Sequence, residues 1–328
     1  MHKKIEVCPG TLREGFDTYS PACKRSVFFN KKVSHVLPYK SPNQSEEDNA
    51  KFLENRKRIS ISGVQEKLSL TLIKNKLKLT ERGEQGKYIL KPIPRDLKLV
   101  DDVPANEHLT MQIASQVYNI NTAANALIFF ESGEQAYITK RFDVKEDGGK
   151  WGKEDFASLA ERSISTHGKE FKYEGISYEE VAELIKHYVG AYQIEIEKYY
   201  KLILFNFLFS NGDAHLKNFS LLETSEGDYI LSPAYDLLNT RIHVADTYFA
   251  LKNGLLKDGS VRSPSLKDFL KFGQLIGMSE KRVNRICHSF LERKELVYEM
   301  IERSFMSEKA KKGYLIHFNT RWNVLSGK

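Results

Sequence analysis

The spacing of apolar residues changes near the middle of this chain. In residues 68–90 and 127–142, apolar residues form short, partly alternating runs separated by turns, which predicts antiparallel strands. From Asp155 onward they recur at intervals of three and four residues, which predicts amphipathic helices. Strands in one part and helices in another are typical of α+β proteins. We therefore expect a two-lobed α+β fold, with a β-rich N-terminal lobe (residues 1–145) and a helical C-terminal lobe (residues 146–328).

The same spacing places individual helices. Residues 106–119 form an amphipathic pattern after the turn-forming pair Val103-Pro104, so we expect one helix within the β-rich lobe. Residues 178–192 and 194–209 predict two long helices, and the second is strongly apolar. The polar segment 41–58 predicts a loop or a short exposed helix.

Composition limits the class of protein. No apolar run approaches the roughly 20 residues that cross a bilayer, and the N-terminus has no signal core, so we expect a cytoplasmic protein without a membrane partner. The three cysteines predict reduced thiols, with a zinc site formed by Cys8, Cys23, His2 and His35 as the minor alternative. The net charge of +7 fits solvated helix faces first and an anionic partner second.

The strongest chemical signal is the segment from Asn211 to Asn218, directly after the apolar helix. Asp213 and Asn218 reproduce the D-x-x-x-x-N spacing of a kinase catalytic loop, in which the Asp accepts the proton of the acceptor hydroxyl and the Asn helps to hold Mg²⁺. Asp236 ends the following hairpin, in the place of a second metal-binding Asp. The alternative is that these residues only form turns and helix caps.

Further candidates would contact the nucleotide. Lys91 ends an apolar strand, where its amine can pair with phosphate oxygens, and Glu107 in the following helix can position that amine. The segment from Ser60 through Ser62 and Gly63 is small enough for backbone N–H groups to approach phosphate. The remaining candidates for nucleotide contact are Lys140, Phe142, His215 and Lys217. Exposed lysines, helix-dipole glutamates, strand-entry turns and core aromatics are the alternatives.

Taken in order, these elements resemble the HipA family of toxin–antitoxin kinases, from about Ile59 through the C-terminal helices. The resemblance implies a protein-kinase-like two-lobed fold that uses ATP and Mg²⁺. It implies that Lys91 is the ATP lysine, that Lys140 and Phe142 border adenine, and that Asp213, Asn218 and Asp236 are catalytic and metal residues. It also implies self-regulation by autophosphorylation of Ser60 or Ser62. The motifs that carry this resemblance begin with Ser60-Ile-Ser62-Gly63, Tyr88-Ile-Leu-Lys91, Asn106-Glu107, Lys140-Arg-Phe142, Glu154-Asp-Phe, Asn211-Gly-Asp213 and Leu231-Ser-Pro.

Only about sixty residues precede the expected phosphate loop, so the chain is more similar to HipT, the shorter kinase of three-component HipBST systems, than to long HipA. The resemblance then implies a small HipS-like antitoxin, a HipB-like protein through which DNA is reached indirectly, and an aminoacyl-tRNA synthetase substrate: glutamyl for HipA, tryptophanyl for HipT. The expected function is a serine/threonine protein kinase that acts as a type II toxin and inhibits translation. The alternatives are a small-molecule or lipid kinase and a non-catalytic ATP-binding scaffold in a DNA-bound repressor complex.

Overall fold

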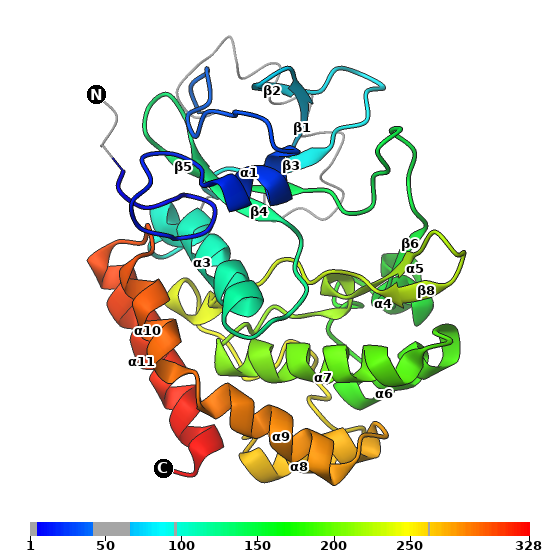
Figure 1. The fold of residues 1–328 in the computed structure, drawn as a ribbon. Helices are drawn as coiled ribbons and strands as arrows, with labels where there is room; N and C mark the ends of the chain where they lie inside the picture. Colours follow the sequence, from blue (N-terminus) through cyan, green and yellow to red (C-terminus); the bar gives the residue numbers. More distant parts are fainter. Residues whose placement is uncertain (1–4, 42–65, 95–96, 262) are drawn as a thin grey trace.

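A five-stranded antiparallel sheet lies at one end of the molecule (Figure 1). The computed structural model describes residues 5–41, 66–94, 97–261 and 263–328. The strand order is β2-β1-β3-β5-β4, so β3, which carries Lys91, is central. The strands are β1 (Leu68–Ile73), β2 (Lys76–Leu79), β3 (Tyr88–Lys91), β4 (Asn125–Phe129) and β5 (Gln135–Lys140). Both predicted β regions are thereby confirmed.

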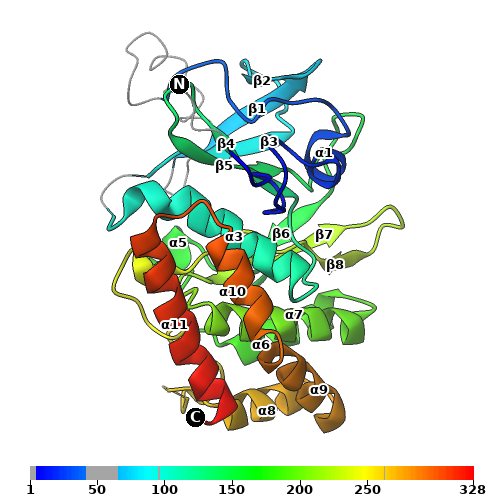
Figure 2. The same ribbon diagram turned by 60° about the vertical axis from the view of Figure 1, so that its left-hand side comes forward.

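The N-terminal segment and the short helix α1 (Pro21–Phe28) cover one face of this sheet (Figure 2). Apolar side chains from both sides form a separate small core there, which includes Tyr19, Phe28, Leu70, Tyr88 and Ile138. Tyrosine hydroxyls fasten the two layers together, because Tyr19 donates to the carbonyl of Leu127 at 2.7 Å and Tyr88 to that of Val27 at 3.0 Å.

Cys8 and Cys23 belong to this small core, and both are buried free thiols. Within the described ranges, no group of three or more His, Cys, Asp or Glu side chains is arranged to hold a metal ion. His2 lies outside the described residues, and His35 contacts Thr18 instead. The minor zinc alternative therefore gains no third ligand from the structure.

Helix α3 (Val103–Gln116) covers the opposite face of the sheet. It begins three residues earlier than predicted, with Pro104 in its first turn, where the missing N–H has no helical partner to lose. Its other side packs against the C-terminal helices: Thr110 shares a hydrogen bond of 2.8 Å with Tyr314, and Ser307 donates to Asp102 at 2.6 and 2.7 Å. Helix α3 is thus fastened to both the sheet and the helical part.

The rest of the chain is mainly helical and surrounds the apolar helix α7 (Tyr192–Leu208). The two predicted long helices are confirmed with shifted ends, because α6 (Tyr178–Tyr188) stops before Gly190. No helix that the described residues form is long and apolar enough to span a membrane. The other α-helices in the part of the chain that the structure describes are α4 (Phe156–Leu159), α5 (Ile164–His167), α8 (Leu266–Leu275), α9 (Glu280–Leu291), α10 (Lys294–Glu302) and α11 (Glu308–Ser326).

A second sheet lies within this helical part. The predicted hairpin is confirmed as β7 (Ser220–Glu223) and β8 (Tyr229–Leu231), and β6 (Lys153–Asp155) pairs with β7 on its other side. Strand β6 was not expected, since its three residues are polar and carry no alternation. The 211–218 loop connects α7 to this sheet, and Asp236 follows its last strand. Both expected chemical segments are therefore held at the same sheet.

Candidate active site

A cavity of about 1410 Å³ lies where the five-stranded sheet, α3 and the 211–218 loop meet. Every predicted site residue that the structure describes lines it: Lys91, Glu107, Lys140, Phe142, Asp213, His215, Lys217, Asn218 and Asp236. These residues come from both halves of the chain, so only the folded protein brings them together. Ser60, Ser62 and Gly63 lie outside the described residues.

A buried ion pair joins the sheet to α3. The Nζ atom of Lys91 lies 2.6 Å from a carboxylate oxygen of Glu107, and these side chains are only 4% and 2% exposed. Lys91 also contacts the carboxylate of Asp236. Burial by itself lowers the pKa of Lys91, but the two carboxylates outweigh it and raise that pKa above its ordinary value. Burial raises the pKa of Glu107, although Lys91 opposes the effect.

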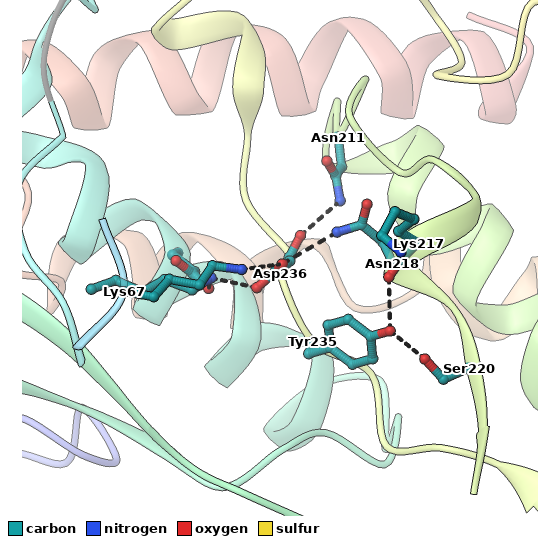
Figure 3. A network of polar contacts seen from close by, with 9 residues as sticks. Lys67, Asn211, Lys217, Asn218, Ser220, Tyr235 and Asp236 are labelled. Atoms are coloured by element: carbon teal, nitrogen blue, oxygen red, sulfur yellow. Dashed lines mark hydrogen bonds and ion pairs between the residues drawn. The ribbon is translucent and has the colours of Figure 1, made fainter. Parts of the chain in front are cut away.

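Asp236 is the centre of the polar network in Figure 3. Its backbone is in the left-handed region at φ 57°, which non-glycine residues seldom adopt. Besides Lys91, its carboxylate faces Lys67 at 3.7 Å and accepts from Asn218 Nδ2 at 3.4 Å. Burial alone raises the pKa of Asp236, but Lys67 and Lys91 outweigh it and hold that pKa below its usual range. The carboxylate is therefore ionised at neutral pH.

The side-chain amide of Asn218 carries an oxygen of the kind that binds metal ions. Its Oδ1 atom is buried and makes no hydrogen bond to any part of the chain that the structure describes, while its Nδ2 donates to Asp236. Amide and carboxylate oxygens are ligands that Mg²⁺ accepts, usually one or two of them together with water and substrate phosphates. Asn218 and Asp236 together therefore fit a Mg²⁺ ion carried with a nucleotide.

Asp213 is exposed to the same cavity, from a loop whose backbone is tightly fixed. Tyr173 donates a hydrogen bond of 2.8 Å to its Oδ1 atom. The surrounding protein removes water from the carboxyl group and raises its pKa, which the bond from Tyr173 partly offsets. The neighbouring Gly212 donates its N–H to Thr240 at 2.9 Å, and a Cβ at Gly212 would overlap the carboxylate of Asp246. A side chain at this position would therefore force the Asp246 carboxylate or the loop to move.

Aromatic side chains form another wall of the cavity. The rings of Phe142 and Tyr235 lie 5.7 Å apart between centroids, tilted by 33°. The Lys153 ammonium lies 5.5 Å from the Tyr235 ring centre. The Tyr235 hydroxyl donates to the carbonyl of Lys217 at 2.9 Å and contacts Ser220 at 2.5 Å, as Figure 3 shows. This pair of aromatic rings on the cavity wall suits a planar base.

The three other predicted residues contribute less directly. The ammonium of Lys140 lies 3.8 Å from the centre of the Phe29 ring. Because this side chain lies on the opposite face of the sheet from that of Lys91, mainly the backbone of Lys140 faces the cavity. Lys217 is paired with Asp155 at 2.5 Å. His215 is buried, which lowers its pKa to about 3, so its imidazole is neutral. Their roles with a nucleotide stay predictions.

Sequence reasoning assigned no role to Lys67 or Tyr173. Lys67 ends the glycine-containing segment that begins at Ser60, so a basic residue at the entry to the first strand was a usable signal. Tyr173 lies in a short connection between α5 and α6, far in sequence from Asp213. Neither periodicity nor spacing marks it, and only the tertiary structure reveals its contact.

Comparison with known proteins gives a family and a fold. A Haemophilus influenzae protein named "Putative kinase" is 26% identical over 272 residues, which cover 76% of this chain and 77% of that protein. "Putative kinase Y4dM" of Sinorhizobium fredii is 27% identical over 259 residues, 75% of this chain and 60% of its own length. "Putative kinase Y4mE" of the same organism is 27% identical over 187 residues, 56% of this chain and 43% of its own length.

The solved structures that share the fold include these two. One belongs to the Shewanella oneidensis toxin–antitoxin complex of HipA, HipB and operator DNA, with a TM-score of 0.65, 20% identity, and coverage of 88% of this chain and 74% of that one. The other is the Helicobacter pylori proinflammatory kinase CtkA, with a TM-score of 0.51, 16% identity, and coverage of 78% and 93%. The predicted two-lobed, HipA-like α+β fold is thus confirmed. Because the family model described as the HipA-like C-terminal domain matches residues 59–296, this chain belongs to the HipA-like C-terminal domain family.

Proposed function

We propose that this protein is an ATP- and Mg²⁺-dependent serine/threonine protein kinase and the toxin of a type II toxin–antitoxin system. One observation carries the proposal: Asp213, Asn218, Asp236 and the Lys91–Glu107 pair converge on one cavity from four separate segments. The kinase names of its relatives and the kinase fold of its structural neighbours support the same reaction class.

In this proposal each polar side chain has a defined task. Lys91, held by Glu107, neutralises phosphate oxygens of ATP. Asn218 Oδ1 and the Asp236 carboxylate would hold Mg²⁺, which neutralises charge on the phosphates when bound. Asp213 accepts the proton of the acceptor hydroxyl while that oxygen bonds to the γ-phosphorus, the bond to the bridging oxygen breaks and ADP leaves.

The remaining residues orient the nucleotide. Phe142 and Tyr235 offer their rings to the adenine, and the backbone at Lys140 borders it. His215 and Lys217, which lie between Asp213 and Asn218 in the sequence, line the same cavity and would lie beside the phosphates. We place the lobe boundary at residues 145–146, so that the nucleotide binds between residues 1–145 and 146–328.

Self-regulation would act through Ser60 or Ser62. A phosphate there adds about −1.5 to −2 charges close to the basic residues Arg56, Lys57 and Arg58, which would hold the phosphate loop away from ATP. Lys67 lies five positions after Ser62 and contacts Asp236, so displacement of the loop would reach the proposed metal residue through Lys67.

The proposed partners follow from the family. In the Shewanella system HipA is bound with HipB and operator DNA, which supports a HipB-like protein as the link to DNA for this chain. We further propose a HipS-like antitoxin, as in HipT systems, and a tryptophanyl- or glutamyl-tRNA synthetase as the substrate. Phosphorylation of that enzyme would stop translation in the cytoplasm.

The test is the intact mass of phosphatase-treated protein before and after incubation with ATP and Mg²⁺, followed by phosphopeptide mapping. Wild type should gain phosphate at Ser60 or Ser62, and Asp213→Asn should bind ATP without gaining any. The same pair of proteins is then incubated with purified synthetases. ATP binding without phosphate on either the chain or any protein substrate would contradict a protein kinase, and labelled metabolite alone would indicate a small-molecule kinase.

A further inference from the structure

Tyr173 makes the one side-chain hydrogen bond to the carboxylate of Asp213 among the residues that the structure describes. Its hydroxyl lies 2.8 Å from Oδ1. The other polar contacts of Asp213 use its backbone: its N–H approaches Asn211 at 3.4 Å, and its carbonyl accepts from His215 at 2.8 Å. Tyr173 therefore holds one oxygen of this carboxylate directly.

The backbone and the ring of Tyr173 are themselves held in place. The Tyr173 carbonyl accepts from the N–H of Lys252 at 2.8 Å, and the Lys172 carbonyl accepts from the N–H of Leu216 at 3.2 Å. The rings of Tyr173 and His215 pack in a T-shaped arrangement, with 5.1 Å between centroids. The ring thus contacts the 211–218 loop directly, and its backbone is tied both to that loop and to the segment after Asp246. Such support suits a fixed contact rather than a movable cover.

A general base must present one oxygen to the proton that it removes. Tyr173 occupies Oδ1 of Asp213, which leaves Oδ2 for the hydroxyl of an acceptor. Without that hydrogen bond the carboxylate is free to rotate about its Cβ–Cγ bond, because this torsion has no sharp minimum. A supporting residue that fixes such a carboxylate keeps the catalytic site in its productive geometry.

We propose that Tyr173 is a positioning residue for phosphoryl transfer, whose hydroxyl fixes the Asp213 carboxylate so that Oδ2 faces the acceptor hydroxyl. The inference rests on the proposed kinase function. It adds a residue that no sequence motif of this chain indicates and that contacts neither of the proposed metal ligands in the structure.

The charges around Asp213 agree with this role. The groups that act on it are Tyr173, the cations of Lys172 and Lys67, and the carboxylate of Asp236. Asp246 lies against the neighbouring Gly212, and His215 is neutral. Burial raises the pKa of Tyr173, and the carboxylate of Asp213 raises it further, so the phenol stays a donor. Its hydrogen bond favours the ionised form of Asp213 against the burial that raises the pKa of Asp213.

The test substitution is Tyr173→Phe, which keeps the ring on His215 and removes only the hydroxyl. Loss of a hydrogen bond to a charged group should lower kcat about 10- to 100-fold and leave KM for ATP nearly unchanged. The acid limb of the pH–rate profile should move to higher pH, because Asp213 loses a contact that favours its ionised form. The matched control is Tyr178→Phe, whose lost hydroxyl donates to the carbonyl of Ala214 at 2.8 Å in the same loop but does not touch Asp213.

A second readout does not require turnover: the Asp213 carboxyl carbon is titrated by NMR in nucleotide-free protein, where Tyr173→Phe should raise its pKa and Tyr178→Phe should not. Together the two results support the proposal. It is overturned if Tyr173→Phe keeps wild-type kcat and titration, if it loses rate with an unmoved acid limb as a merely structural residue would, or if its rate rises. Failure of wild type to transfer phosphate while the NMR shift is present would contradict the kinase proposal and leave the Tyr173–Asp213 contact established.

Discussion

Replacing Lys91 by methionine should destabilise this protein strongly, because it leaves a buried carboxylate without its cation. Glu107 is 2% exposed and its ion pair with Lys91 is 2.6 Å long. Removing one partner of such a buried pair costs roughly 3–5 kcal/mol. Asp236 also loses a contact, but it is 26% exposed and keeps Lys67 at 3.7 Å. Most of the cost therefore arises at Glu107, and we expect about 3 kcal/mol.

The double variant Lys91→Met/Glu107→Leu provides the matched control. It removes both charges and fills the same volume with apolar atoms, a replacement that is often neutral or stabilising. We expect it to recover about 2 kcal/mol of the loss that Lys91→Met causes. Urea unfolding followed by fluorescence measures this directly, since 3 kcal/mol shifts the midpoint by about 1 M when the slope is about 3 kcal/mol per M.

The pH dependence has a definite sign. Burial already raises the pKa of Glu107 above its ordinary value near 4.5, and loss of the Lys91 cation raises it further. A carboxyl group whose folded pKa is raised binds more protons in the folded state, so its stability is present below the unfolded pKa and is lost as pH rises through the folded pKa. The deficit of Lys91→Met relative to wild type should therefore be larger at pH 8 than at pH 5.5. Equal deficits at both pH values, or losses that simply add in the double variant, would refute the argument.

Three further predictions concern the site. Asn218→Ala should weaken binding of Mg²⁺–ATP about tenfold or more while metal-free ATP binds as before, which isothermal titration with and without Mg²⁺ measures. Phe142→Ala should raise KM for ATP about tenfold through lost stacking on the base, with little change in kcat, and equal KM values would contradict the adenine assignment. Gly212→Ala should lower kcat by about tenfold to a hundredfold by pushing the loop away from Asp246, and Asp246→Ala in the same chain should restore part of it.

Local pattern was enough to predict most of the fold. The alternation at residues 68–90 and 127–142 and the helical spacing at 178–209 reflect which side chains of each segment are buried. These strands and helices were therefore predicted from sequence, although some of their ends were shifted. Strand β6 was missed because its three polar residues pair only with β7, a partner that lies 65 residues away. The end of α6 was misplaced since Gly190 breaks a periodic pattern that otherwise continues.

The residues of the candidate site also fall into those that the sequence predicted and those that it did not. Asp213 and Asn218 lie on one loop, so their fixed spacing in the sequence shows their relation in space. Lys67 and Asp236 are in contact although they lie 169 positions apart, and Tyr173 and Asp213 although they lie 40 positions apart. No local sequence pattern encodes either contact. Strand alternation would have shown that the Lys140 side chain lies opposite to that of Thr139, which faces the cavity.

Helix α3 bears on how such an enzyme exchanges its nucleotide. It carries Glu107 and packs on the sheet, while Asn106 donates to the carbonyl of Asn239 at 2.9 Å and Thr110 bonds to Tyr314. A helix tied in this way resists the rotation by which two-lobed enzymes open and close. We expect ATP to enter and ADP to leave through local movement of the segments that line the cavity, while the two lobes keep their positions relative to each other. A binding partner would then control this enzyme by holding one of the segments that line the cavity, because the two lobes make no large relative movement for a partner to block.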